Sequence, residues 1–173
     1  VLHSPRDWIV VPVCGIVGGL AGGLFSRALV VAALGLVGRG GNWLRTHPIL
    51  FGVGCGLVVA ICGFASDGAI YGTGYAQAKM VVQSDGALPL LYAPLKFIAT
   101  VASSISGLPG GLFSPSLSVG AGLGADIARL FPSTPMSAVV LLGMVGYFTG
   151  VVQAPITAFV IVSEMTDNHN LLI

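Results

Sequence analysis

The residues best suited to chemistry in this sequence form a short phrase rich in glycine and proline. It reads Gly110-Gly111-Leu112-Phe113-Ser114-Pro115 and is preceded by Gly107 and Pro109. Glycine and proline interrupt helices, so the phrase predicts a break followed by a new helix whose first backbone N–H groups lack partners within that helix. Such N–H groups and the helix dipole attract anions without a charged side chain, and glycine lets an anion approach the backbone closely. The phrase alone fits a simple turn between two helices equally well.

The surrounding sequence is far more apolar than a water-soluble domain. Hydrophobic residues make up 55% of the 173 residues and charged residues only 8%, whereas soluble domains carry about 25% charged residues. Four stretches contain no charge at all, namely residues 8–26, 46–66, 97–125 and 130–163. Because a helix spans the hydrocarbon core with about 20 apolar residues, the composition predicts an all-α integral membrane protein.

The elements that must position the phrase are helices of unequal length. They are predicted over residues 8–38, 47–64, 75–82 and 88–106, from the phrase to about residue 130, and over residues 137–150 and 155–166. Several of them are short for a full crossing, and breaks fall inside apolar sequence, which is typical of transporters with discontinuous helices. Glycines four residues apart, as at Gly15, Gly19 and Gly23, predict faces on which two helices approach closely.

Two phrases in this order resemble the CLC family of chloride channels and chloride/proton antiporters. Residues 110–115 are similar to the Gly-x-Phe-x-Pro filter segment of that family, and residues 153–157 (Gln-Ala-Pro-Ile-Thr) with 164–168 (Glu-Met-Thr-Asp-Asn) resemble its next signature. The resemblance spans essentially the whole chain and corresponds to family helices J to P. Residues 1–173 are therefore expected to be part of a CLC transmembrane transport domain, an inverted-topology repeat with short, tilted and broken helices, without its first half and last helices.

The resemblance implies site residues and partners as well as a fold. Leu112 and Phe113 match the two positions whose backbone amides hold a chloride ion. The candidate anion-binding residues are Gly111, Leu112, Phe113 and Ser114, the filter turn is Gly107, Pro109, Gly110 and Pro115, and the dimer interface includes Pro155, Leu171 and Leu172. The resemblance further implies a homodimer in the bilayer of a plasma or inner membrane, a multi-pass topology, chloride as the transported ligand and no cofactor.

The family residues that would distinguish an antiporter from a channel lie outside this sequence. The serine ligand and the gating glutamate belong to first-half motifs, the internal proton-transferring glutamate belongs upstream of Val1, and a tyrosine ligand belongs beyond Ile173. The family as a whole favours chloride/proton antiport, with protons as the second substrate. A passive voltage-gated chloride channel is the alternative.

A few polar and aromatic residues outside the phrase have two interpretations. Lys96 lies where the family has a basic residue, and it either attracts anions toward a vestibule or extends its ammonium to the membrane interface. Glu164 is interpreted as an interfacial acid, with a proton relay as the alternative. Trp8, Trp43 and Tyr92 lie near helix ends and are interpreted as anchors in the interface.

Other classes of protein fit less well. A net charge of +1 provides no basic patch for nucleic acid. No metal-ligand spacing and no catalytic acid pair occurs in the apolar segments, so neither a metal site nor an enzyme is expected. A cation-coupled transporter with broken helices would place acids near the break, and residues 97–125 contain none. A membrane scaffold without transport activity explains the glycines but leaves the break unexplained.

Overall fold

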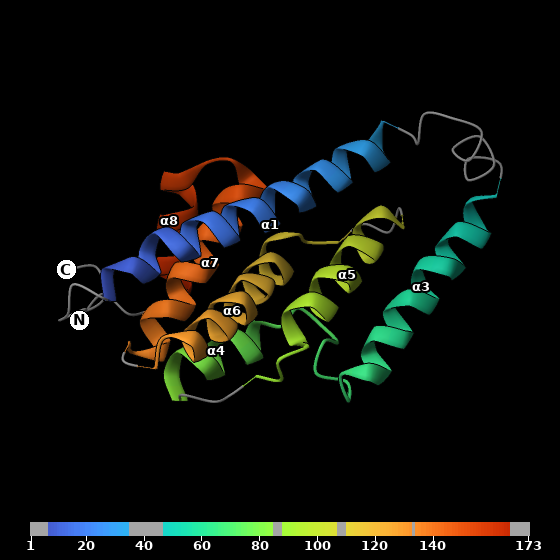
Figure 1. The fold of residues 1–173 in the computed structure, drawn as a ribbon. Helices are drawn as coiled ribbons and strands as arrows, with labels where there is room; N and C mark the ends of the chain where they lie inside the picture. Colours follow the sequence, from blue (N-terminus) through green and yellow to red (C-terminus); the bar gives the residue numbers. More distant parts are fainter. Residues whose placement is uncertain (1–6, 35–46, 85–87, 107–109, 133, 167–173) are drawn as a thin grey trace.

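The computed structural model describes residues 7–34, 47–84, 88–106, 110–132 and 134–166, and within these ranges the regular structure is entirely helical. One 3-10 turn, η1 (Asp7–Ile9), leads into the first long helix. The α-helices follow as α1 (Val10–Ala33), α3 (Pro48–Ala65), α4 (Tyr75–Ser84), α5 (Tyr92–Ile105), α6 (Phe113–Leu130), α7 (Met136–Val152) and α8 (Pro155–Thr166). The predicted all-α class is confirmed (Figure 1).

The ends of the helices follow local backbone rules. Pro48 and Pro155 each open a helix, where the missing N–H of proline is not needed. Gln153 takes up a left-handed conformation, with φ 57° and ψ 27°, and its N–H donates to the carbonyl of Thr149 at 2.7 Å. This residue ends α7 and turns the chain into α8. α5 begins at Tyr92, four residues later than predicted.

α7 is the central helix of the packed group. It lies against α1 on one side and α6 on the other, while α3 packs mainly on α5 and stands at the edge (Figure 1). The backbones of α6 and α7 approach closely, because a Cβ atom placed on Gly143 would lie 2.6 Å from the Cα of Gly124. A Cβ placed on Gly146 would lie 2.7 Å from the carbonyl oxygen of Cys14 in α1. Glycine therefore sets the spacing on both sides of α7.

The glycines of α1 that face α7 are not the predicted ones. A Cβ placed on Gly18 would lie 2.6 Å from the backbone nitrogen of Tyr147, and Gly22 is packed in the same way against the backbone of α7. A Cβ on any of the predicted glycines, Gly15, Gly19 and Gly23, would meet no atom within 4 Å. Two glycine stripes run side by side along α1, and their spacing alone does not select the one that points at α7. The backbone of the predicted stripe still lies close to α7, because a Cβ placed on Gly150 would lie 2.7 Å from the carbonyl oxygen of Gly19.

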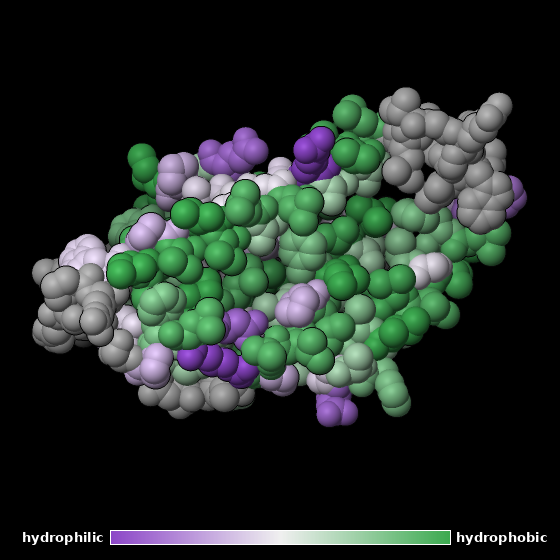
Figure 2. All heavy atoms as spheres, in the orientation of Figure 1, coloured by the Kyte–Doolittle hydropathy of each residue, from purple (hydrophilic) through white to green (hydrophobic). Residues whose placement is uncertain are grey.

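The outer surface of the chain is apolar, as Figure 2 shows for one face. Two helices, residues 10–32 of α1 and the whole of α3, are long and apolar enough to cross a membrane, and only 22% and 17% of them are buried within the chain. A helix in the core of a water-soluble protein would be largely buried. Exposed apolar helices of this length fit a lipid environment.

Candidate anion-binding site

The glycine- and proline-rich phrase leads directly into α6, as predicted. Phe113 is the first residue of the helix, and Leu112 is its N-cap residue, with φ −90° and ψ −23° and no side-chain hydrogen bond to cap the helix. Within the described part of this segment, the first backbone N–H bonded to a carbonyl belongs to Ser116, which donates to Leu112 O at 3.1 Å. Among the described residues, the backbone donors before Ser116 at the start of α6 have no carbonyl partner, which is the arrangement that an anion site requires.

The two glycines before the helix keep space open. Neither Gly110 nor Gly111 has a positive φ, unlike Gly68, Gly72 and Gly74 in the connecting segment between α3 and α4. A Cβ placed on Gly110 or Gly111 would meet no atom within 4 Å, and both residues are exposed. Neither backbone conformation nor packing within the described residues requires glycine here. Glycine at these two positions leaves space beside the first backbone N–H groups of α6.

Leu112 and the two glycines line a cavity of about 860 Å³. The rest of its wall comes from α1, α3, α5, the connecting segment and Pro115. α5 contributes the polar side chains of Lys96, Thr100, Ser103 and Ser104, and the connecting segment contributes that of Tyr71. None of the described residues that line this cavity is acidic. Leu112, the N-cap residue of α6, lies in this lining, and a helix N-terminus favours anions over cations.

The interpretation that Lys96 extends its ammonium to the membrane interface was wrong. The residue is only 2% exposed, and its Nζ donates to the carbonyl oxygens of Ile70 at 2.6 Å and Gly72 at 2.7 Å. Lys96 does line the cavity beside Gly111 and Leu112, and its alternative role in attracting anions stays a prediction. The chain between α3 and α4 passes over α5 and supplies backbone acceptors, which no side-chain pattern reveals.

Tyr92 is also buried, so its interpretation as an interface anchor was wrong. The residue is 1% exposed, and its hydroxyl lies 2.5 Å from Oγ of Ser118 in α6. Its position near the start of α5 is as predicted, but its ring points inward against α6. Of the other two predicted anchors, Trp8 is 63% exposed and Trp43 lies outside the described residues.

The remaining predicted site residues lie at or near the start of α6. The ring of Phe113 packs edge-on against Phe148 of α7, with centroids 5.6 Å apart, a contact that the sequence did not indicate. Ser114 and Pro115 are half-buried in the first turn. Gly107 and Pro109 of the filter turn and Leu171 and Leu172 of the predicted interface lie outside the described residues, whereas Pro155 is exposed at the start of α8.

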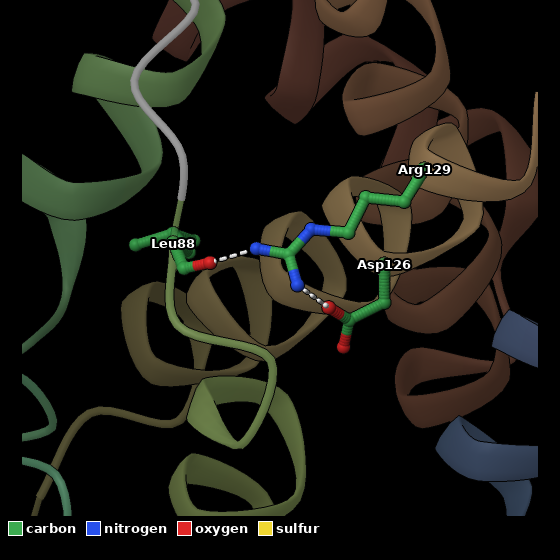
Figure 3. Close-up of polar contacts among 3 residues, drawn as sticks. All are labelled: Leu88, Asp126 and Arg129. Carbon is green, nitrogen blue, oxygen red and sulfur yellow. Dashed lines mark hydrogen bonds and ion pairs between the residues drawn. The ribbon is translucent and has the colours of Figure 1, made fainter. Parts of the chain in front are cut away.

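The opposite end of α6 is fixed to the start of α5. One terminal nitrogen of the Arg129 guanidinium donates to the carbonyl of Leu88, and the other lies 3.8 Å from Oδ1 of Asp126 (Figure 3). Leu88 precedes α5 in the chain, so this contact joins the C-terminal end of α6 to the segment that leads into α5. α6 is thereby held at the end remote from its free amides.

Apolar outer helices together with a helix start that faces a cavity are features of a membrane domain with discontinuous helices. The family described as voltage gated chloride channel matches residues 1–173. This chain belongs to that family, the CLC family, as its two sequence phrases predicted.

Two relatives illustrate the similarity. The chain is 33% identical over 173 residues to the H(+)/Cl(-) exchange transporter ClcA of Yersinia pestis bv. Antiqua (strain Angola), with 92% of the chain and 34% of the relative covered. It is 30% identical over 187 residues to the voltage-gated ClC-type chloride channel ClcB of Salmonella typhimurium (strain LT2), with 99% and 41% covered. The chain thus spans between a third and two fifths of the length of these relatives. No solved structure matches it.

Proposed function

We propose that the protein containing this chain transports chloride across a membrane, and that the backbone N–H groups of Leu112 and Phe113 hold the anion, beside Gly111 and Ser114. The observation that carries this proposal is the uncapped start of α6 in front of a cavity without acidic lining. Partial charges on amides bind an anion weakly enough to release it again, as rapid transport requires. The printed names of both relatives, a chloride exchanger and a chloride channel, support chloride as the ligand.

Within this function we propose exchange of chloride for protons, carried out by a multi-pass domain in a plasma or inner membrane without a cofactor. Residues 1–173 would form one part of that domain. The similarity to an H(+)/Cl(-) exchange transporter supports this choice. A passive voltage-gated chloride channel is the second candidate, because the relative named as a channel is similar over 99% of the chain.

Ion flux from liposomes tests the proposal. Liposomes that contain the full-length protein are expected to release chloride and bromide but neither sodium nor potassium, because a helix N-terminus attracts anions and repels cations. A chloride electrode measures the release, and liposomes without protein are the control. In an exchanger, a chloride gradient also drives protons across the membrane, which an external pH electrode detects. Sodium flux without chloride flux would contradict the anion assignment.

We also propose that the full-length protein is a homodimer and that α8 lies in the interface. α8 packs mainly on α7, and its Ile156, Phe159 and Val160 are exposed. The change Ile156→Trp is expected to reduce chemical cross-linking between subunits, in detergent and in lipid, because a larger ring prevents close packing of the two copies. Ile49→Trp, at an equally exposed position of α3, is the matched control. Equal cross-linking of the two variants would place the interface elsewhere.

A further inference from the structure

We infer that Lys96, Tyr92 and Ser118 form a clasp that seats residues 70–74 of the connecting segment on α5 and α6 and so fixes one wall of the cavity. In this assignment Lys96 is a positioning residue and does not bind the transported anion. The functional part of the inference rests on the proposed chloride transport. Its structural part, the seating of the segment, is independent of what the protein carries.

The Lys96 ammonium depends on the connecting segment. An ammonium buried in an apolar setting is stable only when its N–H groups have acceptors. No acidic partner for Lys96 occurs among the described residues, and the acceptors are the carbonyl oxygens of Ile70 and Gly72. Hydrogen bonds to a charged group are stronger than those between neutral groups. The buried charge therefore draws the segment onto α5.

The end of the segment packs closely against a second pair of residues. Tyr92 and Lys96 are four residues apart and share one face of α5. The Tyr92 hydroxyl bonds with Ser118 of α6, and a Cβ placed on Gly74 would lie 3.0 Å from that hydroxyl. Gly72 and Gly74 have φ values of +71° and +74°, which glycine adopts readily. These backbone conformations at Gly72 and Gly74 allow the segment to pack against the face of α5 that carries Tyr92 and Lys96.

The clasp joins the cavity wall to the helix that carries the candidate anion site. Ile70, Tyr71 and Gly72 line the same cavity as Gly111 and Leu112. Ser118 lies only five residues after Phe113 in α6. Displacement of the segment would therefore alter the cavity in front of the α6 amides without changing the amides themselves.

Transport by full-length variants in liposomes separates this role from anion attraction. The segment shapes the cavity wall and not the α6 amides, so chloride is expected to bind the forms with and without the seated wall equally. If Lys96→Met then leaves the wall seated in about one tenth of the molecules, the maximal chloride turnover falls about tenfold with a nearly unchanged chloride KM. Lys96→Arg, which keeps charged donors, is expected to recover most of the turnover. The matched control is Lys79→Met, at an exposed lysine of α4. A different result would overturn the inference: Lys96→Met raises the chloride KM, leaves the maximal turnover unchanged, and the increase in KM disappears at high ionic strength. This is the result expected of a lysine that attracts anions, because salt screens such attraction.

Hydrogen exchange of the same full-length variants tests the clasp without reference to transport. Peptides covering residues 66–74 are expected to exchange faster in Lys96→Met and in Tyr92→Phe, while peptides from α1 and α7 exchange as in the unchanged protein. Unaltered exchange in residues 66–74, or a uniform increase along the whole chain, would overturn the inference. If the unchanged protein carries no chloride but the local increase is present, the proposed function fails and the clasp stands.

Discussion

The change Gly111→Val in the full-length protein is expected to lower chloride turnover about a hundredfold, the effect of losing one preorganised N–H donor from a site of this kind. Valine places two methyl groups in the space in front of the α6 amides, which Gly111 leaves empty. Phe113→Leu is expected to leave turnover within about threefold, because a backbone amide is the proposed ligand and both residues provide one. Chloride flux from liposomes measures both.

The structure supplies the control for this comparison. Gly111 has no positive φ and a Cβ there meets no atom within 4 Å, so valine is expected to leave the fold intact. Gly52→Val makes the same change at an open position of α3. Thermal unfolding in detergent should be similar for the two valine variants. The opposite result, loss of transport in Phe113→Leu but not in Gly111→Val, would contradict the proposal. It would show that the anion is held by the side chain of Phe113 and not by the backbone amides.

The second large effect concerns stability. Gly143→Ala is expected to destabilise the full-length protein by about 3 kcal/mol, at the upper end of what overpacking costs. The new Cβ would lie 2.6 Å from the Cα of Gly124 and 2.7 Å from the carbonyl oxygen of Gly120, and neither of these backbone atoms can rotate away as a side chain could. α6 and α7 must separate to admit the methyl group.

Unfolding in mixed micelles of increasing denaturing detergent measures this loss. Gly15→Ala is the matched control, since it makes the same change in an exposed position of α1 where no atom lies within 4 Å. That variant should be as stable as the unchanged protein or slightly more so, because alanine favours helix over glycine. Equal destabilisation of both variants would show that helix spacing is not the cause.

Features that depend on a few neighbouring residues could be predicted from the sequence. The start of α6 at Phe113 follows from the glycines and prolines before it, and the start of α8 follows from Pro155. These signals are local, because proline and glycine act on the backbone of their own segment. Apolar length likewise indicated α1 as a candidate membrane span, whereas the helix over residues 47–64 was expected to be short for a full crossing and α3 is long enough for one.

Features that depend on which surfaces meet could not be predicted. The sequence offered two glycine stripes on α1, and only packing against α7 selects the one with Gly18. The partners of Lys96 could not be predicted, because they are carbonyls, which every residue possesses. Tyr92 was placed in the interface for its aromatic type, whereas its neighbour Ser118 lies 26 residues further along the chain.

The burial of Lys96 has a consequence for the biosynthesis of the protein. A lysine in the middle of a membrane helix makes insertion less favourable by about 2.5–3.5 kcal/mol. α3 contains no charged residue and can enter the bilayer on its own. The carbonyl groups of Ile70 and Gly72 follow α3 in the chain and precede α5. Since ribosomes synthesise proteins from the N-terminus, these acceptors leave the ribosome first, and the charged helix reaches the membrane after the carbonyl groups that accept its hydrogen bonds.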